Sequence, residues 1–309
     1  MEGFTYQRGD RYSGMNASLE SVPCITAEKY AKVSEQIFPL EGPCFDREGT
    51  LYFTSTAGFS VFKMDIESKE VQRIFFQEGI RPAAVKIHQD GRLFCACLTN
   101  EDMGGIFVMN PDGSDPEWIL RGYSVDDMVF DTSGGFYFND LTGTFRNPTG
   151  AIYYMENDWK SLHCFCPNMS MPNGLALSPD KKVLWATELL GLRLHRFDLA
   201  PGRGGELSCV PYRFTGFLGP DSCEVDADNN LYVAMPEQGQ VIVFNTYGSP
   251  IGRILMPGRT DGRFLYVTHT MVRPGTKEIY ITAMDSEEGP WILRAGAFAE
   301  ADMTMYQFS

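Results

Sequence analysis

The sequence predicts an all-β fold, a six-bladed β-propeller with four-stranded blades around a central channel. Three observations predict it: a segment that recurs six times, almost no helical periodicity, and turn residues between β-rich runs. In each copy a short apolar segment leads into a turn with Asp, Asn or Gly, and a run of Val, Ile, Phe and Tyr follows the turn. A repeat of about 40–50 residues with several strands per unit is typical of a propeller.

The six copies are ordered along the chain, and the last is the weakest match. They read EGPCFDREGTLYFT from Glu41, AAVKIHQDGRLFCA from Ala83, DDMVFDTSGGFYFN from Asp126, NGLALSPDKKVLWAT from Asn173, DSCEVDADNNLYVA from Asp221 and THTMVRPGTKEIYIT from Thr268. A single blade cannot cover its own apolar faces, whereas neighbouring blades in a ring cover one another. Six copies therefore predict six blades in one closed unit.

A second β-like run follows each copy. These runs are FSVFKMD from Phe59, GGIFVMN from Gly104, GAIYYME from Gly150, LRLHRFDL from Leu192, GQVIVFN from Gly239 and WILRAGA from Trp291. Later runs such as VQRIFF from Val71 and VPYRFTG from Val210 fit a further strand of each blade.

The ends of the chain are expected to close the ring. Within the N-terminal segment 1–40, TAEKYAKV from Thr26 fits either one helical turn or an extended approach. We expect part of this segment, with the C-terminal MYQFS, to complete the last blade. No Ser/Gly linker or charge block divides the chain, so 1–309 is predicted to be a single propeller domain.

The composition excludes several classes of partner. The net charge of -14 and a pI near 4.7 argue against nucleic acid and anionic membrane surfaces, which need clustered Lys and Arg. The polar N-terminus lacks a signal-peptide apolar region, and no long apolar stretch suits a membrane span. The eight cysteines include two C-x-C pairs and no zinc-finger spacing, so we expect reduced thiols. We expect a cytoplasmic protein.

One repeat position carries oxygen in most copies. In a propeller the first strand of each blade lines the channel, so equivalent positions form a ring. The ring is predicted to contain Glu41, Ala83, Asp126, Asn173, Asp221 and Thr268, with the hydroxyl of Ser222 adjacent. Singly, these residues also fit strand-entry turns or a solvated loop tip. Because these residues share one repeat position, we interpret them as one common binding site instead.

The chemistry of the ring favours a metal ion. Carboxylates this close cannot all stay ionised without a cation or raised pKa values. Oxygen ligands without His or Cys suit Ca²⁺, Mg²⁺ or Mn²⁺ better than Zn²⁺. Ca²⁺ accepts mixed carboxylate, amide and hydroxyl ligands in loose geometry. We therefore expect Ca²⁺ first, with Mg²⁺, Mn²⁺ or Zn²⁺ as substitutes.

Several motifs together resemble the gluconolactonase/regucalcin (senescence marker protein) family of six-bladed propellers, and are closest to its drug-responsive bacterial lactonase branch. The resemblance covers about residues 35–309. It is carried by PAAVKIHQDGRLF, VDDMVFDTSGGFYF, PNGLALS, KKVLWATE, LRLHRFDL, GPDSCEVDADNNLYVAM and PGRTDGR, besides the EGP of Glu41.

The resemblance implies a lactone-hydrolysing enzyme with one catalytic divalent cation, usually Ca²⁺. It implies that the cation is held by Glu41, Asp126, Asn173, Asp221 and Ser222, and that Asp221 is the general acid/base. The implied substrate is a small or medium lactone, whose carbonyl the cation polarises while Asp221 activates water. The branch also holds a second, structural calcium, for which Asp102 and Gly104 are candidates. We leave the presence of this second calcium ion open, because the following WILRGYSVDD segment is shorter than in that branch.

Other functions remain open on the same platform. One is a non-hydrolytic enzyme, or an enzyme acting on another ester or a phosphotriester; another is a non-enzymatic calcium-binding scaffold.

His269 follows the sixth ring position and is a candidate pocket residue, whereas His88, His163 and His195 are expected to be structural or exposed. The loop from Asn139 to Gly150 either edges the site or only connects strands. The oligomeric state is left uncertain.

Overall fold

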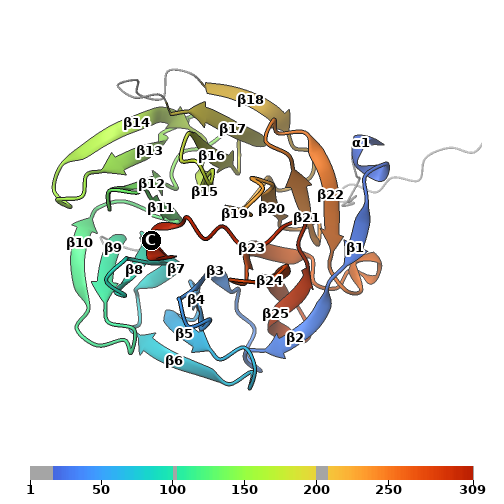
Figure 1. Ribbon diagram of the computed structural model, residues 1–309, viewed down its shortest axis with the longest axis horizontal. Helices are drawn as coiled ribbons and strands as arrows, with labels where there is room; N and C mark the ends of the chain where they lie inside the picture. Colours follow the sequence, from blue (N-terminus) through green and yellow to red (C-terminus); the bar gives the residue numbers. More distant parts are fainter. Residues whose placement is uncertain (1–16, 100–102, 200–207, 309) are drawn as a thin grey trace, which may run out of the picture.

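The computed structural model describes residues 17–99, 103–199 and 208–308. Its strands form six separate sheets, arranged as blades in a ring around a central channel (Figure 1). Helix in the described residues is limited to α1 (Ala17–Glu20) and the 3₁₀ helices η1 (Arg259–Asp261) and η2 (Tyr306–Phe308). The predicted all-β, six-bladed propeller is confirmed.

Each blade begins with its innermost strand, and the next strands follow outward. Blade 1 contains β3 (Glu41–Phe45), β4 (Leu51–Ser55), β5 (Ser60–Met64) and β6 (Val71–Phe76). Blade 2 contains β7 (Arg81–Ile87), β8 (Leu93–Leu98), β9 (Gly105–Met109) and β10 (Glu117–Arg121). Blade 3 contains β11 (Met128–Phe130), β12 (Phe136–Asp140), β13 (Gly150–Met155) and β14 (Leu162–Met169).

The second half of the ring has the same plan. Blade 4 contains β15 (Pro172–Leu177), β16 (Val183–Glu188), β17 (Arg193–Asp198) and β18 (Ser208–Arg213). Blade 5 contains β19 (Cys223–Val225), β20 (Leu231–Met235), β21 (Gln240–Phe244) and β22 (Pro250–Leu255), with β1 (Cys24–Thr26) added. Blade 6 contains β23 (Tyr266–Val272), β24 (Glu278–Asp285), β25 (Gly289–Gly296) and β2 (Glu28–Lys32).

The N-terminal strands join the end of the ring to its beginning. β2 is the outermost strand of blade 6 and pairs antiparallel with β25, while β1 pairs parallel with β22 of blade 5. TAEKYAKV is therefore extended and not a helical turn. The chain then runs directly from β2 into β3 of blade 1, which ties the last blade to the first (Figure 1).

The prediction for the C-terminal MYQFS is wrong. This segment pairs with no strand of blade 6, because β2 already occupies the outer edge of that sheet. It instead crosses the end of the channel (Figure 1), where the side-chain amide of Gln307 donates to Sγ of Cys44 at 3.4 Å. The ring of Tyr306 packs 5.0 Å from that of His88. The C-terminus thus covers the channel rather than extending a sheet.

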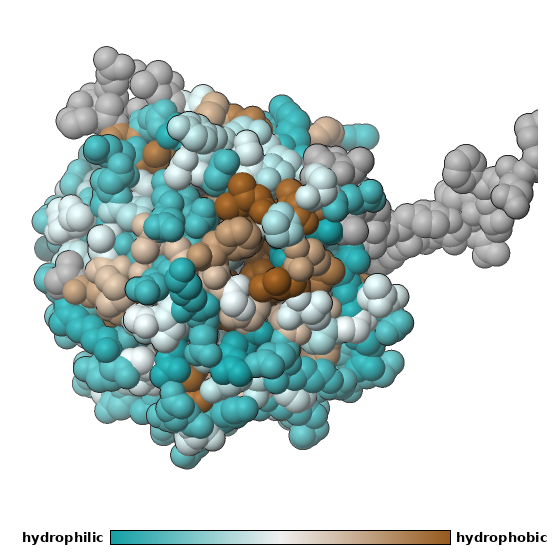
Figure 2. Space-filling model, turned by 45° about the vertical axis from the view of Figure 1, so that its right-hand side comes forward, coloured by the Kyte–Doolittle hydropathy of each residue, from teal (hydrophilic) through white to brown (hydrophobic). Residues whose placement is uncertain are grey.

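The outer surface is mostly hydrophilic, as the acidic composition implies. Figure 2 shows this, with one group of hydrophobic residues near the centre of that view. The short helices of the described residues fall far short of a membrane-crossing length. All eight cysteines are free thiols, in line with the expected reduced state.

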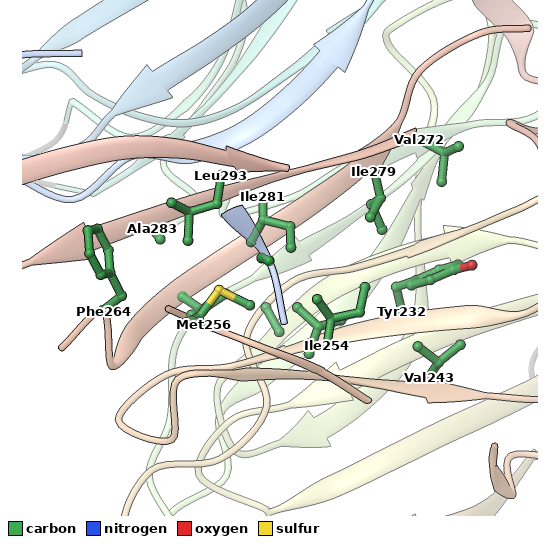
Figure 3. Packing of buried hydrophobic residues seen from close by; sticks show 14 of the residues in the cluster. Tyr232, Val243, Ile254, Met256, Phe264, Val272, Ile279, Ile281, Ala283 and Leu293 are labelled. Carbon is green, nitrogen blue, oxygen red and sulfur yellow. The ribbon is translucent and has the colours of Figure 1, made fainter. Parts of the chain in front are cut away.

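The core lies between the blades rather than at one centre. Figure 3 shows the cluster between blades 5 and 6, in which Ile254 of blade 5 lies in one apolar cluster with Ile281 and Leu293 of blade 6. Each large apolar side chain buried in this way stabilises the fold by about 1.5–3 kcal/mol. The interfaces between blades hold the inner strands in place around the channel.

Candidate functional site

The predicted ring residues stand at one level of the channel. Each lies at the beginning of an innermost strand or just before it, in the strands β3, β11, β15 and β19. The side chains of Glu41, Asp126, Asn173, Asp221 and Ser222 are all buried, none more than 7% exposed. Neighbouring inner strands contact one another all around the ring, so the structure brings these five side chains into one enclosure.

Local irregularities turn the side chains into the channel. The pairing register shifts at the ring level in β3, β7, β15 and β23, where the inner strand meets the second strand of its blade. Such bulges re-aim side chains and are common beside active sites. The repeat therefore specifies the direction of the ring residues as well as their level.

Two glycines next to ring residues are required by close packing of inner strands. A Cβ on Gly42, which has φ +41°, would lie 2.2 Å from Cα of Ala84 in blade 2. A Cβ on Gly174 would lie 2.4 Å from the backbone nitrogen of Cys223 in blade 5. Any side chain at either position would push neighbouring blades apart. The Glu-Gly and Asn-Gly pairs thus place an oxygen ligand where the inner strands of two blades approach closely.

The second strands of blades 3 and 4 hold the ring in place, which the sequence analysis missed. Oδ1 of Asn139 accepts hydrogen bonds from the backbone nitrogens of Asp126 and Asp127, at 2.8 and 3.3 Å. Its side-chain amide donates to the carbonyl of Asn173. The hydroxyl of Thr187 accepts from the backbone nitrogen of Gly174 at 2.7 Å and donates to the carbonyl of Asp221 at 2.6 Å.

Blade 6 repeats this arrangement. The hydroxyl of Thr282 accepts from the backbone nitrogen of His269 at 3.1 Å, and the hydroxyl of Thr268 donates to the carbonyl of Leu40 at 2.6 Å. Between blades 4 and 5, the hydroxyl of Ser222 donates to Oδ1 of Asn173 at 3.2 Å. The bonds from Asn139 to Asn173, from Thr187 to Asp221 and from Ser222 to Asn173 link neighbouring blades, and the others tie an inner strand to the second strand of its own blade or to the chain before blade 1.

The three carboxyl groups of the ring face one another without a counter-charge. Burial, then the charge of Asp221 and that of Asp126, raises the pKa of Glu41 well above its usual value. Burial and the charge of Asp127 raise the pKa of Asp126 to about 7. Burial and the charge of Asp126 also raise the pKa of Asp221 well above its usual value. Among the described residues, none of the three makes an ion pair.

Tyr266, at the start of β23, is a further residue of the site that the sequence analysis missed. Burial, followed by the charges of Asp221, Glu41 and Asp126, raises the pKa of its phenol above the usual value. The phenol therefore lies near enough to the ring carboxyl groups for their charges to keep it protonated. A neutral phenol in this place is a hydrogen-bond donor for a ligand in the channel.

The ring suits a hard divalent cation in its donor chemistry. Three carboxylates, one amide and one hydroxyl are ligands that Ca²⁺ accepts, and a cation would relieve the repulsion that raises the three pKa values. In the part of the chain that the structure describes, no three His, Cys, Asp or Glu side chains form a tight cluster of their own. The predicted set is a wider ring that also depends on Asn173 and Ser222.

A second group of charges lies one layer deeper in the channel. Nζ of Lys86 lies 3.1 Å from Oδ1 of Asp127 and 4.0 Å from Oε2 of Glu224. Nε2 of His269 lies 3.7 Å from Oδ2 of Asp127. We call these four residues the channel charge cluster. Although burial opposes the shift, Lys86 and His269 hold the pKa of Asp127 below its usual value, whereas burial raises that of Glu224.

The four histidines have different surroundings. His269 is fully buried in the channel wall, below the ring. His88 stacks among aromatic rings at the opposite end of the inner strands, next to a cavity of about 250 Å³ that Asp46 and Gln307 also line. His195 lies 2.7 Å from the carboxylate of Glu188, and His163 is exposed.

Two further sequence predictions have separate outcomes. Asp102 lies outside the described residues, so the second calcium site stays a prediction; Gly104 is buried before β9. The predicted loop from Asn139 to Gly150 begins inside β12, whose Asn139 holds the backbone of two ring residues; whether the connection after Asp140 edges the site stays a prediction.

Comparison with known proteins finds similarity over most of the chain. A family model described as the SMP-30/gluconolactonase/LRE-like region matches residues 41–285. Lactonase drp35 of Staphylococcus saprophyticus is 45% identical over 303 residues, which cover 94% of this chain and 93% of the relative.

Solved structures show the same fold at low identity. Regucalcin from Agrobacterium tumefaciens, described as a calcium-binding protein, has a TM-score of 0.72 at 17% identity, covering 91% of this chain and 98% of its own. A gluconolactonase from Xanthomonas campestris has a TM-score of 0.70 at 18% identity, covering 89% and 96%. At these identities the two structures support the fold alone.

Proposed function

The chain belongs to the SMP-30/gluconolactonase/LRE-like family, and from this premise we propose that it is a calcium-dependent lactonase acting on a small or medium lactone. The observation that carries the proposal is the buried ring of oxygen donors without a counter-charge. The extended identity to a relative named as a lactonase supports the reaction class. The oxygen donors of the ring support a hard divalent cation as the bound metal.

The residues that would hold the ion are Glu41, Asp126, Asn173, Asp221 and Ser222. When bound, a divalent cation polarises the lactone carbonyl and stabilises the oxyanion that forms on it. Ca²⁺ is the expected ion because it tolerates a mixed and loose donor set, and Mg²⁺ or Mn²⁺ are the nearest substitutes.

Asp221 is proposed to move the proton. Its carboxylate takes a proton from the attacking water as the new C–O bond forms, and returns that proton to the alkoxide when the ring C–O bond breaks. Burial and the charge of Asp126 raise the pKa of Asp221 in the metal-free protein, and a cation bound at the ring would lower it again. The hydroxyl of Thr187 holds the backbone carbonyl of Asp221 and so orients this side chain.

The proposal is tested by acid release from a panel of lactones, followed at constant pH with chelator-treated protein. We expect no turnover without metal, recovery with Ca²⁺, and weaker recovery with Mg²⁺ or Mn²⁺. Binding of Ca²⁺ measured by calorimetry, with no turnover on any lactone, would favour a non-hydrolytic enzyme or a calcium-binding scaffold. Turnover that survives complete chelation would refute the role of the metal.

A further inference from the structure

The channel charge cluster has no part in the proposed chemistry, yet it is one of the most enclosed features of the molecule. Lys86 is 8% exposed and Glu224 6%, while Asp127 and His269 are fully buried. The four side chains come from blades 2, 5, 3 and 6, so the cluster spans most of the ring. Buried charges carry a large desolvation cost, and removing one partner of a buried pair is strongly destabilising.

Blade 2 supplies no ligand to the ring, but it places Lys86 near the ring. That blade contributes Ala83 to the ring, a residue with no ligand atom in its side chain. Three residues further along β7, Lys86 directs an ammonium group to Asp127, which follows Asp126 in the sequence. Blade 2 thus supplies a fixed positive charge one layer below the ring.

Asp127 transmits this contact to two ring residues. Its Oδ1 accepts from the backbone nitrogen of Met128 at 2.8 Å, and its Oδ2 accepts from that of Leu175 at 3.0 Å. The first bond fixes the backbone beside Asp126, and the second fixes the strand that carries Asn173. A displaced Asp127 would therefore move predicted ligands from both blade 3 and blade 4.

The cluster is closed from the other end by the C-terminal segment. A cavity of about 30 Å³, with room for about one water molecule, lies among Lys86, Glu224, Cys44 and the residues Met305, Tyr306 and Gln307. Asp127 itself is fully buried, so bulk solvent does not supply it with an alternative partner, and Lys86 is its main counter-charge.

We propose that Lys86 is a positioning residue of the metal ring: it acts through Asp127 to hold Asp126 and Asn173 at the spacing that the cation requires. The inference rests on the proposed function, because it presumes that the ring binds the ion. Lys86 touches neither the ion nor the substrate. Groups that orient metal ligands in this way commonly contribute about 10–100-fold to metal affinity.

A positioning role and a simple charge effect predict opposite results. Removing a positive charge near a cation site strengthens cation binding by Coulomb's law. Loss of a positioning contact weakens it. The variant Lys86→Met therefore distinguishes the two by the sign of the change in Ca²⁺ affinity.

The experiment is calorimetric titration of Ca²⁺ into chelator-treated full-length protein, for wild type and variants. We expect Lys86→Met to bind Ca²⁺ at least ~10-fold more weakly and Lys86→Arg to stay close to wild type. The double variant Lys86→Met/Asp127→Asn should bind better than Lys86→Met, because it does not leave Asp127 as an unpaired buried carboxylate. Lys181→Met is the matched control: Lys181 lines the same small cavity but lies 3.3 Å from the buried Asp302, and among the described residues it makes no ion pair with Asp127 or Glu224.

The outcomes separate the two proposals. Unchanged or tighter Ca²⁺ binding in Lys86→Met, with wild-type protein that binds Ca²⁺ and hydrolyses a lactone, would overturn the positioning role alone. Wild type that does not bind Ca²⁺ would overturn the proposed function itself. Should Lys86→Met fail to fold, Lys86→Gln gives the same comparison: weaker binding supports the role, and wild-type affinity contradicts it.

Discussion

Asp126 and Asp127 are neighbours in the sequence and are both buried in the channel, yet the pKa values of their carboxyl groups shift in opposite directions. Asp126 faces other carboxylates, and its pKa is raised to about 7. Asp127 faces Lys86 and His269, which hold its pKa below the usual value despite the burial. One residue belongs to the ring and the other to the channel charge cluster.

The difference shows how two neighbouring layers of one channel divide their tasks. The charge cluster contains its own cation, Lys86, which pairs with Asp127. The ring contains carboxylates from blades 1, 3 and 5 without such a cation, so a bound divalent ion is the missing partner. A buried carboxylate therefore indicates a ligand site here only where the fold supplies no positive charge to it.

The largest expected effect lies in the ring. Asp221→Asn should lower kcat by about 10²–10⁴-fold, because an amide cannot accept the proton of water. Ca²⁺ binding should weaken but remain measurable, since one of five predicted ligands changes charge. Lactone turnover at saturating Ca²⁺ measures the effect.

Asp226→Asn is the control for this variant. Asp226 is also a buried carboxylate of blade 5, but it accepts hydrogen bonds from Asn230 and Tyr232 away from the ring. Its loss should lower stability with little change in kcat. Equal kcat values for the two variants would contradict a special role for Asp221.

Next in size is an effect on stability that should differ in sign between the two neighbours. In chelated protein, Asp127→Asn removes the main partner of a buried lysine and should cost about 3–5 kcal/mol of unfolding free energy. Asp126→Asn removes a repelled carboxylate and should raise the stability of chelated protein by ~1 kcal/mol. Urea unfolding in chelator measures both. Similar losses for the two variants would show that Asp126 has a stabilising partner after all.

The sequence predicted the ring because its residues share one position in the repeat. In a closed ring of blades, equivalent repeat positions lie at the same level around the axis. The same logic would have found two of the missed residues. The copies end in YFN and LWAT, so Asn139 and Thr187 occupy one equivalent position on the second strands. That position is polar in several blades, and the structure shows it bonded to the ring backbone.

Other features depend on which blades meet, and the repeat does not carry that information. Lys86 contacts Asp127 and Glu224 only because three inner strands converge on the axis. Blade 6 recruits β2 because its own repeat lacks a fourth strand, which displaces the C-terminus onto the channel. These contacts arise from ring closure, a property of the whole chain rather than of one copy.

The smallest expected effect is the pH dependence of the chelated protein. Asp126 has a raised pKa of about 7 when folded and about 3.9 when unfolded. Below both values each state is protonated, so the group has no effect. Between them the unfolded chain has released the proton while the folded protein retains it, so stability falls as the pH rises. Glu41 and Asp221 shift in the same direction.

We therefore expect chelated protein to lose ~2–4 kcal/mol of unfolding free energy between pH 5 and pH 8, at about 1.4 kcal/mol per pKa unit. Saturating Ca²⁺ should remove or reverse this slope, because the ion binds the ionised carboxylates. Chelated Asp126→Asn should show a shallower slope than wild type, while Lys181→Met should not. Thermal unfolding across this pH range provides the measurement. A chelated wild type that gains stability toward pH 8 would mean that the ring carboxylates already have a positive partner, and the contrast between Asp126 and Asp127 would then be lost.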